Sequence, residues 1–176
     1  MSPFQISPLE SADRLAVEAL LDRVFGSGRK SKSSYRLRAG NPPCLALAFA
    51  ARMDGRLVGS VQQTRVAVGD AGARALLLGP LAVEPELRGQ GIGRALLRRS
   101  LDAARAAGWR HVFLVGERAY YEPLGFGPAA AVGVRVAGEP ADRVHHMLLI
   151  PDNPAPRGEL RAWPQPCPGG DTAALQ

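Results

Sequence analysis

The spacing of apolar residues predicts two long helices. Residues 11–25 repeat apolar side chains every three or four positions, which places them on one buried helical face. Ser11 is suited to cap this helix, because its hydroxyl can accept a hydrogen bond from the first turn. A second helix is predicted over residues 92–107, with Gly108 as a typical helix end.

Apolar runs elsewhere indicate β-strands. Residues 44–53 and 56–68 flank Asp54-Gly55, a dipeptide typical of a hairpin turn. Residues 73–83 form another predicted strand, interrupted by Gly79-Pro80. Because proline cannot donate to a sheet ladder, this interruption indicates a bulge or bend. Shorter strands are predicted at residues 4–7, 109–115, 131–137 and 144–150, the last two as a closing pair, and short helices at residues 35–39 and 117–126.

This alternation predicts one α/β domain over residues 1–150, followed by a proline-rich and partly irregular tail over residues 151–176. Within the tail, residues 158–163 could add an edge strand, and residues 167–176 are expected to be disordered. At 176 residues and 46% hydrophobic, the chain can form one core. Its first residues lack the pattern of a signal peptide, and no apolar run reaches membrane-spanning length, so we expect a cytoplasmic protein.

The cysteines and histidines predict no metal site. Cys44 and Cys167 are far apart and lack a C-x-x-C partner, which argues against a zinc site and against a disulfide framework. Cys44 is interpreted as a small core residue. His111, His145 and His146 show no metal-ligand spacing and are interpreted as structural.

The charge distribution favours an anionic ligand. The net charge is +6, and the segment 28–38 carries five positive residues and no acid. Such a balance is compatible with nucleic acid, an anionic membrane or an anionic small molecule. The segment lacks the interleaved aromatic residues of a single-strand platform, so a basic rim around an anionic ligand fits it better than binding to nucleic acid or membrane.

Three alternating glycines open the second long helix, namely Gly89, Gly91 and Gly93. Positions without a Cβ let successive N–H groups point at one anion, and the helix start adds unpaired N–H groups and its positive dipole end. Arg88 and Arg94 flank the loop and add charge. The spacing is neither G-x-G-x-x-G nor a Walker loop, so the pattern predicts a phosphate or pyrophosphate site of a third class.

The segment Arg88-Gly89-Gln90-Gly91-Ile92-Gly93 resembles motif A of the GNAT superfamily of N-acetyltransferases. The resemblance extends over residues 4–149. It implies the GNAT fold: an α/β, mixed and mostly antiparallel sheet with a central splayed pair of parallel strands, flanked by helices. It also implies acetyl-CoA as co-substrate, with its pyrophosphate held at residues 88–94. The pantetheine arm would pair with the backbone of the preceding strand. The implied cofactor-binding residues are Leu81, Ala82, Val83, Arg88, Gly89, Gln90, Gly91, Ile92, Gly93 and Arg94.

The same resemblance implies a catalytic tyrosine. Tyr121 matches the family pattern Y-x-x-x-G-F, in which the hydroxyl protonates the departing thiolate. Tyr120 is assigned to packing or to the acceptor pocket. An N–H of Leu81 or Ala82 would support the oxyanion of a tetrahedral intermediate.

Two family features are absent: Leu114 stands where many members carry an asparagine, and the two splayed strands carry no carboxylate. Glu117 and Glu84 follow those strands, but a solvated loop acid is the simpler interpretation of Glu117, and a bound water could replace the base.

These features predict an acetyl-CoA-dependent N-acetyltransferase that acts on a primary amine of a small molecule or peptide by direct attack. In the family, the segment matching residues 29–38 helps to wall the acceptor site, which suggests an anionic acceptor. Its arginines could instead reach the phosphates of coenzyme A or only solvent. The alternative is a GNAT-fold module that senses acyl-CoA without turnover. A basic nucleic-acid-binding protein, whose affinity would fall steeply with salt, is a third hypothesis. The sequence leaves monomer and homodimer open.

Overall fold

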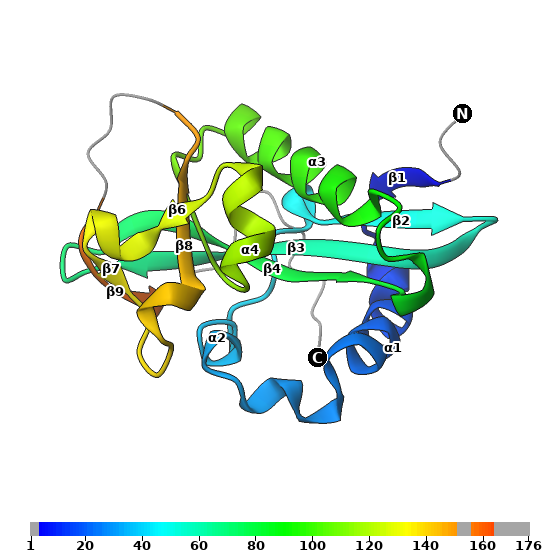
Figure 1. Cartoon of the computed structure of the whole chain (residues 1–176), viewed down its shortest axis with the longest axis horizontal. Coiled ribbons are helices and arrows are strands. Elements are labelled where there is room, and N and C mark those ends of the chain that lie inside the picture. The colour runs from blue at the N-terminus through cyan, green and yellow to red at the C-terminus, as the bar shows by residue number, and fades with distance from the viewer. Residues whose placement is uncertain (1–3, 151–155, 164–176) are drawn as a thin grey trace.

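A mixed sheet of nine strands organises the structure, a computed structural model that describes residues 4–150 and 156–163 (Figure 1). The strand order is β1-β2-β3-β4-β5-β8-β6, with β9 beside β3 and β7 beside β9. The strands are β1 (Gln5–Pro8), β2 (Phe49–Met53), β3 (Arg56–Val68), β4 (Ala73–Val83), β5 (His111–Val115), β6 (Gly127–Pro128), β7 (Val134–Arg135), β8 (Val144–Leu148) and β9 (Gly158–Ala162). The helices are α1 (Arg14–Phe25), α2 (Ser33–Arg36), α3 (Ile92–Ala106) and α4 (Arg118–Tyr121), joined by short 3-10 turns.

The centre of the sheet is a parallel pair, β4 and β5. The pairs that extend the sheet outward on either side, from β1-β2 to β6-β8, are antiparallel. Helices cover both faces, with α3 on one side and α1 and α2 on the other (Figure 1). The predicted fold class, a mostly antiparallel α/β sheet built around a central parallel pair, is confirmed.

Two apolar clusters hold the helices on the sheet. In α3, Ile92, Leu96 and Leu101 are buried at helical spacing and pack in the same cluster as strand residues of β2, β3 and β4. In α1, Leu20 and Leu21 pack in a separate cluster against the same strands. The two long helices therefore fix β4 between them, which positions the strand that leads into the glycine loop.

Two strands and one turn agree with their predicted limits. β3 covers residues 56–68 and β4 covers residues 73–83, as the apolar runs predicted. Asp54 (φ 50°) and Gly55 (φ 77°) form the turn before β3 in the left-handed conformation that a two-residue hairpin requires. The edge strand predicted at residues 158–163 is also confirmed, as β9 pairs with β3.

Three local predictions were wrong. Residues 45–47 form a 3-10 turn, so the strand predicted over residues 44–53 begins only at Phe49. The expected closing pair does not form, because β8 pairs with β5 and β6 while β7 pairs with β9. Ser11 does not cap α1 but lies in a preceding 3-10 turn, where Asp13 accepts a hydrogen bond from the Glu10 N–H (2.9 Å).

Cys44 is buried, as expected of a core residue, but it takes part in a disulfide, which corrects the argument from the sequence against disulfide bonding. Cys167 and the predicted disordered segment 167–176 lie outside the described residues. Within the described ranges, the helices fall short of the length and apolarity of a membrane-spanning segment.

Candidate functional site

The predicted bulge lies in β4. Val61 of β3 pairs with Leu81, whereas Gln63 pairs with Leu78, so β4 contains one residue more than β3 across the same interval. The extra residue falls at Gly79-Pro80, where Gly79 has a φ of 117°. This bulge bends β4 immediately before Leu81, Ala82 and Val83.

Beyond the bulge, β4 and β5 separate. Their pairing is confined to Leu76↔Val112 and Leu77↔Phe113. β5 pairs along its full length with β8 on its other side. Among the described residues, the last part of β4 has no partner strand on the side that faces β5. The parallel pair is therefore splayed, and it leaves an open backbone edge.

The register shows which N–H groups face this open edge. The Glu84 N–H donates to the Val58 carbonyl (2.8 Å), so this pair is hydrogen-bonded to β3. Because hydrogen-bonded and non-hydrogen-bonded pairs alternate in an antiparallel ladder, the N–H groups of Leu81 and Val83 point away from β3. Two N–H groups of the predicted segment are therefore directed into the splay, and that of Ala82 is not.

The glycine loop connects the open edge to α3. Gly89 and Gly91 both have a φ of 82°, and a Cβ at either position would meet no atom within 4 Å. Their requirement for glycine therefore comes from left-handed backbone and not from crowding. The first backbone hydrogen bond into the helix runs from the Ala95 N–H to the Gly91 carbonyl (3.0 Å). In the described part of the chain, the N–H groups of residues 89–94 have no backbone acceptor, so this loop, the candidate anion cradle, leaves them available to a ligand.

Gly93 has a different role from the other two glycines. A Cβ there would lie 2.7 Å from the Tyr120 hydroxyl oxygen and 3.6 Å from the Val83 side chain. Tyr120 thus contacts the first turn of α3 while the residue stays 44% exposed, so its assignment to packing or to the acceptor pocket stays a prediction. Its burial raises the pKa of the phenol, and nearby Arg94 partly opposes that shift.

Tyr121 packs elsewhere, beside the end of β5 and against β8, where its ring centroid lies 6.3 Å from that of His145. Its ring packs edge-on against Phe126 (centroids 5.8 Å apart) and close to Gly116, where a Cβ would collide with the ring. Burial is the main cause that raises the pKa of Tyr121; Tyr120 adds to the shift, and the charge of Arg38 opposes it. The phenol is therefore protonated at neutral pH, as a proton donor must be.

The basic segment does not act as one surface. Arg29 is 1% exposed, and it donates to Asp22 (2.9 Å) and Glu18 (2.6 Å) of α1. This residue is therefore structural, which corrects the prediction that the whole segment rims a ligand. Arg38 is the cation of the segment that reaches the β4 bulge, where its Nε donates to the Gly79 carbonyl (3.1 Å).

Neither carboxylate considered as a base is free. Glu84 is 4% exposed and binds Arg23 (2.6 Å) and Arg56 (3.3 Å), and the Arg23 hydrogen bond is the main cause that lowers the pKa of its carboxyl. Glu117 is exposed and binds Arg143 (2.7 Å). Both carboxylates are engaged in ion pairs, so Glu84 is a structural residue and Glu117 a surface one.

We expect Glu84→Gln to lower Tm at pH 7 by about 2–5 °C, because the charge of a buried hydrogen-bonded carboxylate is removed. The native pKa of Glu84 is lowered, so its stabilising effect is present above the unfolded pKa and disappears as pH falls through the native pKa. The difference in Tm between wild type and variant should therefore close below about pH 4. The exposed neighbour Glu86→Gln is the control; an equal effect of both substitutions at pH 7 would contradict this role.

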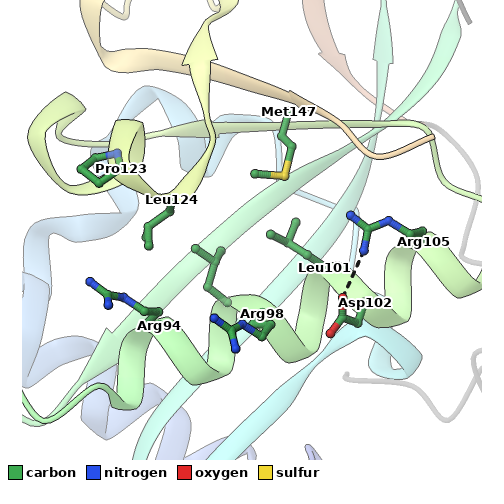
Figure 2. Close-up of a pocket in the computed structure, with 9 residues that line it drawn as sticks. Arg94, Arg98, Leu101, Asp102, Arg105, Pro123, Leu124 and Met147 are labelled. Atoms are coloured by element: carbon green, nitrogen blue, oxygen red, sulfur yellow. Dashed lines mark hydrogen bonds and ion pairs between the residues drawn. The ribbon is translucent and has the colours of Figure 1, made fainter. Parts of the chain in front are cut away.

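A groove with a volume of about 420 Å³ lies between α3 and the segments that carry Pro123, Leu124 and Met147. Its floor is apolar and is formed by Leu97, Leu101, Leu124 and Met147. Figure 2 shows Arg94 and Arg98 at one end of the groove and the ion pair between Arg105 and Asp102 (3.1 Å) at the other.

Two of the groove's arginines remain available for a ligand. Within residues 4–150 and 156–163, Arg94 and Arg98 have no ion-pair partner. Arg98 was missed in the sequence, although its position four residues after Arg94 on one helix face is a usable signal.

The histidines lie on β5 and β8. His111 and His146 are buried, with Nδ1 and Nε2 3.1 Å apart, and the His145 ring contacts the Gly116 carbonyl (3.2 Å). These contacts agree with the interpretation of the histidines as structural residues, which stays a prediction. In the described ranges, no group of three or more metal-ligating side chains comes together.

Comparison with known proteins identifies relatives of the chain. Residues 14–126 match the model of the Acetyltransferase (GNAT) family. The chain is 31% identical over 123 residues to the uncharacterized N-acetyltransferase YjhQ of Escherichia coli K12, covering 69% of this chain and 68% of the relative. It is 32% identical over 138 residues to the uncharacterized N-acetyltransferase YhbS of the same strain, covering 77% of this chain and 82% of the relative.

Solved structures extend the comparison to the fold. The E. coli YhbS structure in complex with CoA has a TM-score of 0.80 at 27% identity, covering 93% of this chain and 91% of that one. A GNAT acetyltransferase from Brucella melitensis in complex with acetyl-CoA shares the fold, with a TM-score of 0.69 at 23% identity and coverage of 93% and 98%. The family match, the relatives and the shared fold show that this chain is an acyltransferase that belongs to the GNAT acetyltransferase family, as the glycine loop predicted.

Proposed function

We propose that the chain is an acetyl-CoA-dependent N-acetyltransferase that transfers the acetyl group to a primary amine of a small molecule or peptide. One observation carries the proposal: the open edge of β4 is followed, after the short 3-10 turn Pro85–Leu87, by the bare N–H groups of the glycine loop. An extended chain with amides at one end and a pyrophosphate at the other matches that arrangement. The molecules named in the YhbS and Brucella structures, CoA and acetyl-CoA, have this shape.

In this proposal, Leu81, Ala82 and Val83 hold the pantetheine arm by adding it to the sheet as an extra strand. The N–H groups of Gly89, Gln90, Gly91, Ile92, Gly93 and Arg94 bind the pyrophosphate, with charge from Arg88 and Arg94. The cradle has no Cβ at Gly89 or Gly91, and its N–H groups lack backbone acceptors in the described ranges, which suits it to a phosphate oxygen.

The groove along α3 would take the nucleotide end of the coenzyme. It begins at Arg94, one turn from the loop, and its apolar floor suits the face of a purine. Arg94 and Arg98 would pair with the phosphate groups that remain outside the loop. Coenzyme A with its 3′-phosphate should therefore bind more tightly than dephospho-coenzyme A.

The chemistry proposed for the site is direct attack of the amine nitrogen on the thioester carbonyl. The C–N bond forms as the carbonyl oxygen becomes an oxyanion, and the N–H of Leu81, directed into the splay, stabilises that charge. When the C–S bond breaks, Tyr121 donates its hydroxyl proton to the thiolate. Since Glu84 and Glu117 are ion-paired, a water molecule would remove the proton from the attacking amine.

The proposal is tested by adding acetyl-CoA and following both stability and turnover. At about 100 times Kd, a ligand that binds only the folded state adds about 2.7 kcal/mol, which corresponds to a rise in Tm of about 5–10 °C for a chain of this size. Thiol release over a broad amine library then measures transfer. A rise in Tm without turnover of any amine would favour the acyl-CoA sensor, and no rise at all would refute the donor site.

A further inference from the structure

Arg38 is a fixed cation beside the β4 bulge. Its Nε donates to the Gly79 carbonyl (3.1 Å), and its Nη1 donates to the Ser34 carbonyl of α2 (3.1 Å). The guanidinium also lies over the Tyr35 ring, 5.3 Å from its centroid. These contacts hold the side chain in one orientation before any ligand arrives.

The charge of Arg38 has no anionic partner among the described residues, since its contacts are two carbonyl groups and an aromatic ring. Burial lowers the pKa of Arg38 to about 10, so the guanidinium is still charged at neutral pH. Arg29 makes the opposite arrangement in the same segment: it also lies over Tyr35 but is neutralised by Glu18 and Asp22. A half-buried cation without a counter-ion is costly, and of these two arginines Arg38 is the one that has no counter-ion among the described residues.

The position of Arg38 excludes the coenzyme phosphates as its partner. The open edge runs from Gly79 to Val83 before the chain enters the glycine loop, which is roughly 13 Å of strand. Arg38 contacts the edge at Gly79, the end away from the loop. The charge of Arg38 also acts on Tyr121. Burial raises the pKa of the Tyr121 phenol, and Arg38 lowers it in part. Arg38 therefore faces the reacting end of the site.

We propose that Arg38 binds a carboxylate group of the acceptor, so that the acceptor class is an amine carrying a carboxylate near its nitrogen, such as a free amino acid. This inference rests on the proposed function and names its substrate class. Of the five N–H groups of a guanidinium, two are used by backbone carbonyls, and the remaining three lie on Nη1 and Nη2. These three free N–H groups match a planar carboxylate, which carries a single negative charge. A phosphate dianion would leave a second charge unpaired at the same half-buried place.

Binding of the acceptor is measured on the coenzyme-A-loaded protein, so that the result does not depend on turnover. The free L-amino acids are compared with the L-amino acid amides, which keep the amine but lack the carboxylate. Phosphoethanolamine and ethanolamine form a second pair that tests a phosphate at the same place. We expect at least one amino acid to bind about 30-fold or more tightly than its amide. No such preference in any pair would overturn the proposal, as would a preference for phosphoethanolamine alone.

Substitution of Arg38 assigns the preference to this residue. We expect Arg38→Gln to weaken binding of the preferred amino acid to the level of its amide, with affinity for coenzyme A changed less than about threefold. Arg38→Lys should keep part of the preference, because it restores the charge without the planar fork. Arg36→Gln, at an exposed arginine of the adjacent helix α2, should keep the full preference for the amino acid.

The other outcomes separate the two proposals. If Arg38→Gln weakens amino acid and amide equally, the residue only supports the bulge, and the inference is wrong. If wild type binds the amino acid but transfers nothing to it, the carboxylate site stands and the proposed transferase activity fails. If the protein does not bind coenzyme A in the first place, the donor site fails, and binding of amino acids to the unloaded protein still decides the role of Arg38.

Discussion

We expect Tyr121→Phe to lower kcat by about 10²–10⁴-fold while the affinity for coenzyme A changes by less than about threefold. The substitution removes only the hydroxyl oxygen, and the packing of the ring against Phe126 and Gly116 is kept. Without that proton, the thiolate must leave unprotonated, so the barrier of the step that breaks the C–S bond rises. Thiol release at saturating acetyl-CoA measures kcat, and titration with coenzyme A measures Kd.

Tyr120→Phe is the matched control, because it removes a neighbouring hydroxyl that lies against Gly93 at the start of α3. We expect this variant to keep kcat within about threefold. Since burial raises the pKa of Tyr121, its protonated form persists across the neutral range, and the alkaline loss of kcat that it causes should begin only above about pH 10. An unchanged kcat for Tyr121→Phe across the amine library would remove Tyr121 from this role.

We expect Gly91→Val to abolish detectable binding of coenzyme A. Gly91 has a φ of 82° directly before α3, in the left-handed region that a β-branched residue rarely adopts. Although a Cβ there would touch no protein atom, it would project into the space in front of the N–H groups of the cradle. The variant should therefore lose the increase in Tm that acetyl-CoA causes in wild type, measured by thermal unfolding with and without ligand.

Gly108→Val separates lost binding from lost stability. Gly108 has a φ of 78° with open space around it, but it follows the other end of the same helix. Both variants introduce similar backbone strain, so both should lower Tm of the unliganded protein by similar amounts. Only Gly91→Val should lose the response to coenzyme A. A normal affinity in that variant would contradict the placement of the phosphates at the loop.

The parts of the site that follow from local chemistry were predictable from the sequence. The bulge at Gly79-Pro80 results from a missing N–H, and the turn at Asp54-Gly55 from a left-handed preference; both are properties of the residues themselves. The pairing of β8 was not predictable in this way, because neighbours in a sheet depend on which edges remain free after the other strands have packed. The apolar residues 45–47 formed a 3-10 turn for a similar reason, since an apolar run alone does not distinguish a strand from a buried turn.

The different environments of the two arginines in the basic segment could not be predicted from the sequence either. Arg29 and Arg38 are nine positions apart, in the same charged run and against the same tyrosine. What separates them is tertiary: α1 supplies two carboxylates to the first, and only carbonyl groups reach the second. A sequence shows how many charges a segment has, but their neutralisation depends on what the fold brings beside them.

The pairing of β9 with β3 has a consequence for self-association. β2 reaches only the first part of β3, so the segment from Val66 to Val68 would present unpaired N–H and C=O groups on that side. An uncovered strand edge of this kind is a template for pairing with another chain. β9 occupies it at Val66, Ala67 and Val68, through the partners Ala162, Arg161 and Leu160. A short strand far from the reacting groups thus protects the longest strand of the sheet against edge-to-edge aggregation.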